Sequence, residues 1–460
     1  MPADPRVVIS GNHSVPLQAL KVIDEELDSY RLWVLNAPRG LPDRDGVTYE
    51  SPFVGVGMRG SARLSYIPCR LSLVPSLFRT TLPPDLVVLS TTPPRDGKVS
   101  LGVEVNILPA AVEAARARGA KVVAQANAHV PWTLGDSELD VDLIDLFLEA
   151  DEPLPTAPPP LIDDISATIG ALVADRVKDG ATLQAGIGAV PDATLYGLAA
   201  RRGLRIWTEM FSDSVLALER AGALDQTTPV QASFLFGSAE LLDWVDRNPR
   251  VRMIRTETSN DPALISRNPA MVSVNTALQV DLFGQANASR VHRRIYSGFG
   301  GQTDFIVGAM HSRGGQALIA LRSWHPKADV STVVPLLDEP VTSFQQSAFV
   351  TEHGIAELWG YDQQAQCRHI IRDAAHPQVR DELWEEAKEL GLVDDETLAQ
   401  RQVRIDPDVR AEADIVRPAL GDRGAGPAAG AGRPAGRTPA RPECGLRSDR
   451  PVLDDAHRLV

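Results

Sequence analysis

The segments DLVVLSTTP (85–93), AAVEAARARGA (110–120) and KVVAQANAHV (121–130) decide the fold class. The first and third are short valine-rich apolar runs, which predict buried strands. The middle segment is rich in alanine and ends at Gly119, a typical helix stop. A strand, a helix and another strand in this order predict a βαβ-like crossover, so we expect an α/β fold with parallel sheets.

The same alternation of short strands and helices continues along the chain. ATLQAGIGAVPDATLYGLAAR (181–201) predicts a strand, a glycine turn and a helix with Pro191 near its start. RIWTEM (205–210) is expected to be one more strand of that layer, and helices are expected at 213–221 and near 379–390. The proline-rich segment 151–164 is unsuited to helix or sheet and predicts a connecting loop.

Chain length predicts more than one domain, because 460 residues (49.6 kDa) are too many for one core. The stretch 222–229 is the best boundary, which gives an N-terminal α/β domain at 1–224 and a C-terminal α/β domain at 225–420. Residues 421–460 are rich in Gly, Ala, Pro and Arg and have few apolar anchors. Such a composition cannot offset the entropy of ordering, so this segment is predicted to be a disordered tail.

Charge and cysteine content restrict the partners and the compartment. The formal net charge of -14 disfavours binding to nucleic acid or to anionic membranes. Cys69, Cys367 and Cys444 lie far apart without a CxxC pair, which suits a reducing compartment. Neither a signal peptide nor an apolar run long enough for a membrane helix is visible, so we expect a cytoplasmic protein.

The segment NTALQVDLFGQANASRVHRRIYSGFGGQTDF (275–305) has the features of a binding site. Its Gly-Phe-Gly-Gly loop leaves backbone N–H groups uncovered, so it can approach a thioester, a phosphate or a carboxylate. Basic residues in and after this segment suit a polyanionic ligand such as a nucleotide diphosphate. An equally supported interpretation is that these basic residues form a solvent-exposed surface and bind no ligand. These basic residues are Arg290, Arg293, Arg294, Arg313, Arg322 and Lys327.

A second glycine turn, at Gly186 and Gly188, lies between a predicted strand and a predicted helix. A helix N-terminus at this point suits a phosphate or an oxyanion. The third glycine of a GxGxxG fingerprint is replaced by Pro191, which disfavours a nicotinamide site. A purely structural turn is the main competing interpretation.

Other catalytic motifs are weak. His353 and Glu357 have the spacing of two residues on one helix face, but no further ligand has zinc-site spacing, so no metal is expected. His311, His325 and His353 are each candidates for an acid or a base, although single histidines near a glycine loop are more often structural. Cys69 in YIPCRL has apolar neighbours, which favour an inert thiol.

Several motifs in register resemble those of the acetyl-CoA hydrolase/transferase family, the class I CoA-transferases that include 4-hydroxybutyrate and acetate CoA-transferases. They are LQAGIGAVPDA, WTEMFSDSV, NTALQVDLFGQANAS, GFGGQTDF and FVTEHGIAELWG, and the likeness runs from about residue 7 to about residue 416. The resemblance implies two α/β domains of related fold with the active site between them, commonly in a homodimer. It also implies coenzyme A or an acyl-CoA as substrate, a carboxylate as its co-substrate, and no permanently bound cofactor.

The resemblance also implies roles for individual residues. Gly354 in TEHGIAEL matches a glycine whose N–H stabilises the developing oxyanion. The loop that receives coenzyme A is matched by Gly298, Gly300 and Gly301. Gln302 and Asp304 are expected to orient that loop or the ligand.

One position departs from the family pattern. The family's glutamate in an ALEVD segment attacks the thioester and forms an acyl-glutamyl anhydride and then a glutamyl-CoA thioester. The corresponding residue is Gln279, whose amide is uncharged and a poor nucleophile. The anhydride route therefore needs another carboxylate.

Four interpretations of Gln279 remain open at this stage. The enzyme hydrolyses acyl-CoA with Gln279 and glycine N–H groups positioning water, or Gln279 becomes a glutamate by deamidation, or Glu209 in WTEM replaces it as the nucleophile. Glu209 is alternatively an ordinary polar residue that caps the following helix. The fourth interpretation is a non-catalytic paralogue that binds coenzyme A. An enzyme is favoured, because glycine loops and a basic cluster suit charge that develops during reaction.

Overall fold

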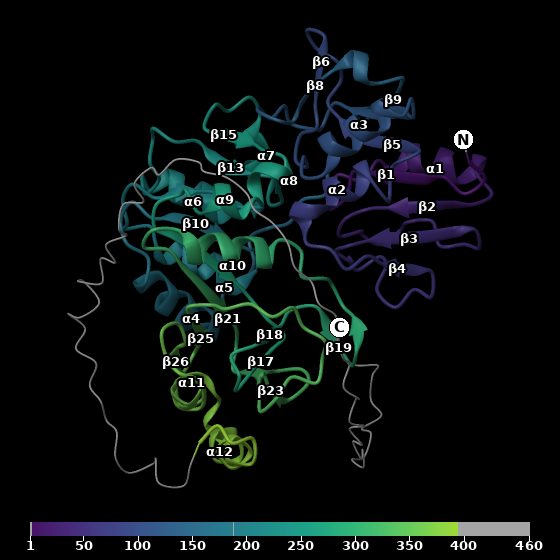
Figure 1. The fold of residues 1–460 in the computed structure, drawn as a ribbon. Helices are drawn as coiled ribbons and strands as arrows, with labels where there is room; N and C mark the ends of the chain where they lie inside the picture. The colour runs from purple at the N-terminus through teal and green to yellow at the C-terminus, as the bar shows by residue number, and fades with distance from the viewer. Residues whose placement is uncertain (1, 187, 394–460) are drawn as a thin grey trace, which may run out of the picture. The chain divides into compact units, whose positions relative to one another are not determined.

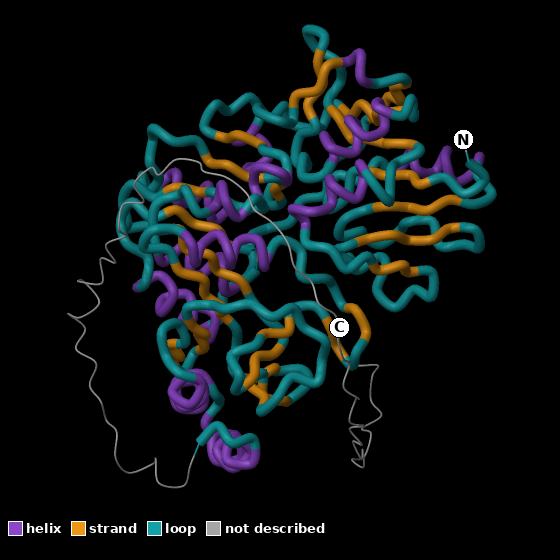
Figure 2. Tube along the Cα trace, in the orientation of Figure 1, coloured by secondary structure: helices purple, strands orange, loops and turns teal. Residues whose placement is uncertain are grey.

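A computed structural model of the chain describes residues 2–186 and 188–393, so the expected tail at 421–460 lies outside the described residues, as do residues 394–420. The N-terminal part forms a seven-stranded sheet in the order β4-β3-β2-β1-β5-β7-β9, in which every neighbouring pair is parallel. Figure 2 shows these strands in orange. Their bounds are β1 (Arg6–Ile9), β2 (Tyr30–Trp33), β3 (Val47–Ser51), β4 (Leu64–Tyr66), β5 (Leu86–Thr91), β7 (Lys121–Asn127) and β9 (Leu146–Ala150).

The predicted crossover is confirmed by β5, α3 and β7. All six residues of β5 are buried, and β5 and β7 pair in parallel along the whole of β5. Helix α3 (Leu108–Ala117) begins with a proline in its first turn and buries most of its alanines, and Gly119 follows it at a φ of 70°. The other helices of this part are α1 (Leu17–Glu26) and α2 (Val74–Arg79), and a short antiparallel pair joins β6 (Lys98–Ser100) to β8 (Glu138–Asp140).

A second sheet has six strands in the order β11-β10-β16-β21-β25-β26. Its pairs are parallel except the last, where β25 and β26 form a hairpin. The labels β10, β21, β25 and β26 mark it in Figure 1. The bounds are β10 (Thr182–Ala185), β11 (Arg205–Ile206), β16 (Met271–Asn275), β21 (Gln316–Ala320), β25 (Ala348–Thr351) and β26 (Gly354–Glu357). Two mostly parallel sheets with connecting helices confirm the predicted α/β class.

Helices connect and cover the strands of the second sheet. Helix α10 packs on β16 and β21, while α4 packs on α5 and on β21, β25 and β26. These and the remaining longer helices are α4 (Asp164–Asp175), α5 (Ala189–Gly197), α6 (Asp213–Arg220), α7 (Ala239–Val245), α10 (Gln302–His311), α11 (Gln363–His369) and α12 (Arg380–Glu389), with short α8 (Thr256–Ser259) and α9 (Pro262–Ile265). Within the described ranges, no helix is both long and apolar enough to span a bilayer.

Small sheets carry the loops around the second sheet. The pair β17 (Gln279–Asp281) and β18 (Ala286–Asn287) is antiparallel, and β24 (Val333–Val334) extends it in parallel. The hairpin of β19 (Arg290–Val291) and β20 (Arg294–Ile295) follows β18 directly. The other two-stranded pairs are β12 (Met210–Phe211) with β14 (Phe234–Leu235), β13 (Val230–Ala232) with β15 (Val251–Met253), and β22 (Trp324–His325) with β23 (Val330–Ser331).

The expectation of one strand at 205–210 was wrong in part. The segment contains two short strands, β11 in the second sheet and β12 in a separate pair, with Glu209 between them. The Thr208 hydroxyl donates to the carbonyls of Ala185 and Met210 and so fixes the bend between the two strands. The second sheet takes strands from both sides of residue 224, and the domain limits at 1–224 and 225–420 stay a prediction.

Candidate active site

Loops at the carboxyl ends of β1, β3 and β4 meet loops that follow β14 and β20. The ring of His13, which follows β1, stacks on Phe236 with the ring centroids 3.3 Å apart. The N–H of Val54, after β3, donates to the carbonyl of Ser297, and the N–H of Leu71 donates to the carbonyl of Gly300 at 3.2 Å. In open α/β proteins, ligands bind at the carboxyl ends of the strands, so this meeting place is the candidate active site.

The Gly298–Gly301 loop lies tightly against the N-terminal part of the chain. Gly298 has a φ of 123°, and a Cβ atom there would lie 2.4 Å from the carbonyl oxygen of Pro52. Gly300 has a φ of 53°, and its Cβ would lie 3.0 Å from the Phe53 ring. Each of these two positions requires glycine, because any other residue would have a strained backbone and its Cβ atom would also clash with the Pro52 carbonyl or the Phe53 ring.

Glu209 and Asn260 lie directly beneath Gly301. A Cβ atom on Gly301 would be 2.0 Å from Glu209 Oε2 and 2.3 Å from Asn260 Nδ2. The Asn260 amide donates to Glu209 Oε2 at 2.9 Å, and the Ser259 hydroxyl donates to Asn260 Oδ1 at 2.6 Å. Burial of the carboxyl group, with a further contribution from the charge of Asp304, raises the pKa of Glu209 to about 7.

Asp304 is a second buried carboxyl group at the same place. It is 0 % exposed, and Ser72 donates to it twice, from its hydroxyl at 2.7 Å and from its backbone N–H at 3.2 Å. The Arg70 Nε atom lies 3.5 Å from Asp304 Oδ1. Burial raises the pKa of Asp304 to about 6, although the bonds from Ser72 act in the opposite direction. Two carboxyl groups therefore titrate near neutrality under the glycine loop.

Gln279 begins β17 and is partly exposed. It pairs in register with Asn287, and the N–H of Leu278 donates to the carbonyl of Asn287 at 2.7 Å. The Gln302 amide, which follows Gly301 in the chain, donates to the carbonyl of Thr276 at 3.2 Å. The loop and the start of α10 thus connect the Glu209 carboxyl to the segment that carries Gln279.

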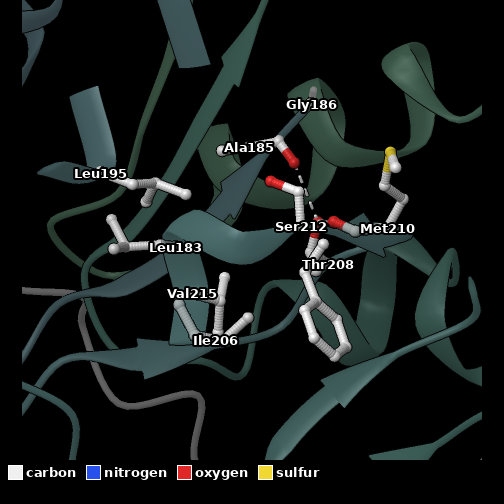
Figure 3. A pocket seen from close by; sticks show the side chains of 10 residues that line it. Leu183, Ala185, Gly186, Leu195, Ile206, Thr208, Met210, Ser212 and Val215 are labelled. Atoms are coloured by element: carbon white, nitrogen blue, oxygen red, sulfur yellow. Dashed lines mark hydrogen bonds between the residues drawn. The ribbon is translucent and has the colours of Figure 1, made fainter. Parts of the chain in front are cut away.

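The other predicted glycines lie at the same edge of the second sheet but make separate contacts. Gly186 follows β10 and lines a small apolar cavity with Leu183, Ile206 and Val215, which Figure 3 shows in close-up. Gly188 precedes α5 at a φ of 115°. Gly354 begins β26 at a φ of 145°, and a Cβ there would lie 3.1 Å from the carbonyl of Asp373.

The suggestion that His353 and Glu357 share a helix face was wrong. The segment is the β25–β26 hairpin, and Glu357 pairs with Arg176 at 2.6 Å. His311 Nδ1 lies 2.8 Å from the carbonyl of Val307 at the end of α10. His325 Nδ1 accepts from the N–H of Ala328. No cluster of three metal-binding side chains occurs within residues 2–186 and 188–393.

The six basic residues singled out in the sequence lie on several different elements, with Arg313 in the turn that follows α10. Arg290, Arg293 and Arg294 lie on or between β19 and β20, next to the glycine loop. Arg322 instead pairs with Asp163 at 3.0 Å, and Lys327 lies in the turn between β22 and β23. Cys69 is buried, and burial raises the pKa of its thiol to about 11, which agrees with an inert side chain.

Sequence reasoning did not find Ser72 and Asn260. Ser72 is 232 residues from its partner Asp304, and Asn260 is 51 residues from Glu209. Neither has a local motif, because their importance arises from contacts between segments that are remote in the sequence.

Comparison with known proteins identifies the class to which this fold and site belong. Residues 43–158 match the acetyl-CoA hydrolase/transferase N-terminal domain, and residues 237–387 match the C-terminal domain. The chain belongs to the acetyl-CoA hydrolase/transferase family, which confirms the resemblance drawn from the sequence motifs. It is therefore an enzyme of the CoA-transferase and acetyl-CoA hydrolase class, with coenzyme A thioesters as substrates.

Individual relatives agree with this assignment. The chain is 39% identical over 355 residues to the 4-hydroxybutyrate coenzyme A transferase of Clostridium kluyveri, covering 74% of this chain and 82% of that protein. It is 33% identical to the succinyl-CoA:acetate/propanoyl-CoA:succinate CoA transferase of Fasciola hepatica, covering 82% of this chain and 83% of that protein. The crystal structure of RipA from Yersinia pestis is similar with a TM-score of 0.79 and 26% identity, covering 85% of this chain and 96% of that one.

Proposed function

We propose that this protein hydrolyses short-chain acyl-CoA thioesters, with water taking the place of the family's carboxylate nucleophile. The observation that carries the proposal is the amide at position 279, since Gln279 cannot form an acyl-glutamyl anhydride. The glycine loop, the carboxyl groups beneath it and the β17–β18 pair that carries this position support retained thioester chemistry.

Glu209 is the general base in this proposal. A catalytic base works best when its pKa lies close to the operating pH, and burial raises the pKa of Glu209 to about 7. Oxygen Oε2 accepts from Asn260, while Oε1 accepts no hydrogen bond from the residues that the structure describes. This leaves Oε1 as the oxygen that receives a proton from water.

The reaction then proceeds by addition and elimination. Water attacks the thioester carbonyl carbon, its proton passes to Glu209, and the negative charge that develops on the carbonyl oxygen is stabilised by backbone N–H groups. We assign these donors to Gly354 and to the Gly298–Gly301 loop. The C–S bond breaks, and the thiolate of coenzyme A takes up the proton held by Glu209. The Gln279 amide positions the water or the thioester, and Gly186 and Gly188 contribute to the coenzyme site.

Asp304 and Gln302 act as positioning residues in this scheme. The bonds from Ser72 hold the Asp304 carboxyl group, and Gln302 is bonded to the carbonyl of Thr276. Both side chains belong to the first turn of α10, so they fix the loop that immediately precedes it.

Two assays test the proposal. Thiol release from acetyl-CoA without any acceptor acid is expected, and addition of excess propionate is expected to yield no propionyl-CoA. Formation of propionyl-CoA would contradict hydrolysis and support a carboxylate nucleophile, either Glu209 or a deamidated Gln279. Borohydride trapping of a glutamyl-CoA thioester, followed by peptide mass spectrometry, would then identify which residue carries it.

The alternative drawn from the sequence, a non-catalytic protein that binds coenzyme A, also fits the uncharged side chain of Gln279 but departs from the enzymatic activity of the family. It predicts calorimetric affinity for acyl-CoA without thiol release at high enzyme concentration. We further propose a cytoplasmic homodimer, as the resemblance implies. Light scattering of the purified full chain tests the dimer, and a monomer at micromolar concentration would contradict it.

A further inference from the structure

We propose that the β19–β20 hairpin, together with Arg59, binds the phosphate groups of the nucleotide portion of coenzyme A. This inference rests on the proposed function, because it uses the same active site and extends it outward. Residues 288–297 of the hairpin and its ends contain three arginines and no acidic residue, in a chain with a formal net charge of -14.

The hairpin connects two parts of the candidate active site. At its start, the side chain of Asn287 donates to the carbonyl of Arg290 at 2.8 Å and accepts from the N–H of Arg290 at 3.0 Å. Asn287 is itself the cross-strand neighbour of Gln279. At its end, the N–H of Tyr296 donates to the carbonyl of Ser289, and Gly298 of the glycine loop follows two residues later. The hairpin therefore joins the strand pair that carries Gln279 to the glycine loop.

The arginines of this region have few acidic partners. Among the residues that the structure describes, no carboxylate forms an ion pair with Arg59, Arg290 or Arg294. Arg293 is different, because its guanidinium lies 3.8 Å from Asp338 and its N–H donates to Glu339 at 2.8 Å. Arg293 thus anchors the hairpin tip. The guanidinium groups of Arg59 and Arg290 each donate one bond to a backbone carbonyl and keep their other N–H groups for an anion, as does that of Arg294.

Aromatic rings hold two of these guanidinium groups. Arg59 lies over the ring of Tyr296 at 3.8 Å from its centroid, and its Nε donates to the Tyr296 carbonyl at 2.8 Å. Arg290 lies over the ring of Tyr66 at 5.9 Å. Stacking on a ring orders a guanidinium group without neutralising its charge. Ordered, unneutralised arginines are the groups that bind phosphate oxygens in two-point contacts.

The hairpin tip has an unusual backbone for its sequence. His292 and Arg293 have φ angles of 49° and 62°, in a two-residue turn where Asn and Gly are normally preferred. The contacts of Arg293 with Asp338 and Glu339 account for a basic residue in this turn, so the arginines that remain for an anion are those beside the turn.

Coenzyme A supplies the chemistry that this surface recognises. Its nucleotide carries a diphosphate and a 3′-phosphate, while its reactive thioester lies at the far end of the pantetheine arm. A cationic hairpin beside the reactive position holds the charged end of the ligand outside while the thioester reaches Gln279. The carboxylic acid product lacks these phosphates and gains nothing from the hairpin.

Titration calorimetry of the full chain with coenzyme A, dephospho-coenzyme A and pantetheine tests the inference. Replacing both free arginines of the hairpin, Arg290→Ala with Arg294→Ala, is expected to weaken coenzyme A binding at least about tenfold, as expected for lost charge-assisted bonds. Pantetheine affinity is expected to stay unchanged. Dephospho-coenzyme A, which lacks the 3′-phosphate, distinguishes the two phosphate groups. If the double variant loses less affinity for dephospho-coenzyme A than for coenzyme A, the hairpin binds the 3′-phosphate. If the two losses of affinity are equal, the hairpin binds the diphosphate.

Matched variants complete the experiment. Arg267→Ala removes an exposed arginine from the connection between α9 and β16, and this variant is expected to leave coenzyme A affinity unchanged. Arg290→Lys with Arg294→Lys retains the charge and is expected to recover part of the loss, which excludes misfolding as the cause. An equal effect of Arg267→Ala and the hairpin double variant would overturn the inference. Intact coenzyme A binding without thiol release would overturn only the proposed hydrolysis.

Discussion

The substitution Glu209→Gln tests whether Glu209 is the general base of thioester hydrolysis. If Glu209 accepts a proton from water, the rate follows the ionised fraction of its carboxyl group, which rises with pH through the pKa of about 7. For that pKa, about one tenth of the groups are ionised at pH 6 and about nine tenths at pH 8. Thiol release by the unmodified chain is therefore expected to increase about tenfold over this interval.

Glu209→Gln keeps the shape and the bond from Asn260 but removes the base. Loss of a positioned general base costs about 100- to 10,000-fold in rate, so the variant is expected to fall by that amount and to lose the pH dependence. The assay is colorimetric thiol release from acetyl-CoA at saturating substrate, measured in half-unit steps of pH. Glu240→Gln, at a side chain that is 63% exposed, is the control and is expected to keep both rate and profile. A variant at position 209 with an unchanged pH profile would refute this role.

Three further predictions concern the surroundings of the site. Asp304→Asn removes a charge that raises the pKa of Glu209, so the midpoint of the pH–rate profile is expected to move to lower pH, and an upward shift would contradict the coupling. Gly298→Ala places a Cβ atom 2.4 Å from the carbonyl oxygen of Pro52 at a left-handed φ and is expected to weaken coenzyme A binding in calorimetry, whereas unchanged affinity would exclude this loop from the site. Glu104 is 1% exposed, and burial raises its pKa to about 8. Its carboxyl group therefore ionises at a lower pH in the unfolded chain than in the folded chain. In urea denaturation, the free energy of unfolding of the unmodified chain is expected to fall by about 1.4 kcal/mol per pH unit relative to that of Glu104→Gln, between about pH 4.5 and about pH 8. A difference between the two chains that stays constant with pH would show that Glu104 does not titrate this way.

Local sequence patterns predicted the elements whose residues are mostly buried. The β5-α3-β7 unit was predicted because its valine runs and its alanine-rich helix carry their signals within a few residues. The segment 205–210 was misjudged because its second half leaves the sheet at Thr208, and that change depends on β14, which lies farther along the chain. The pattern of a single segment contains no information on its pairing partner.

Close backbone approach at the candidate site could be predicted from the glycines, whereas side-chain contacts across the fold could not. Glycines in close succession indicated that the loop from Gly298 to Gly301 lies against other backbone, as the 2.4 Å from a Cβ at Gly298 to the Pro52 carbonyl oxygen confirms, and the role of the loop in binding stays a prediction. The partners that raise or lower the pKa of Glu209 and Asp304 were not found, because Asn260 and Ser72 come from other segments. The pairing of β25 with β26 as a hairpin was also missed, since the spacing of His353 and Glu357 fits a helix equally well.

The central claim is that an amide at position 279 redirects an otherwise complete thioester site from transfer to hydrolysis. Gln279→Glu, assayed with acetyl-CoA and propionate, tests it most directly. The claim predicts that this variant forms propionyl-CoA and a trappable glutamyl-CoA thioester at residue 279, while the unmodified chain only releases thiol. Propionyl-CoA formation by the unmodified chain at the rate of the variant would contradict it.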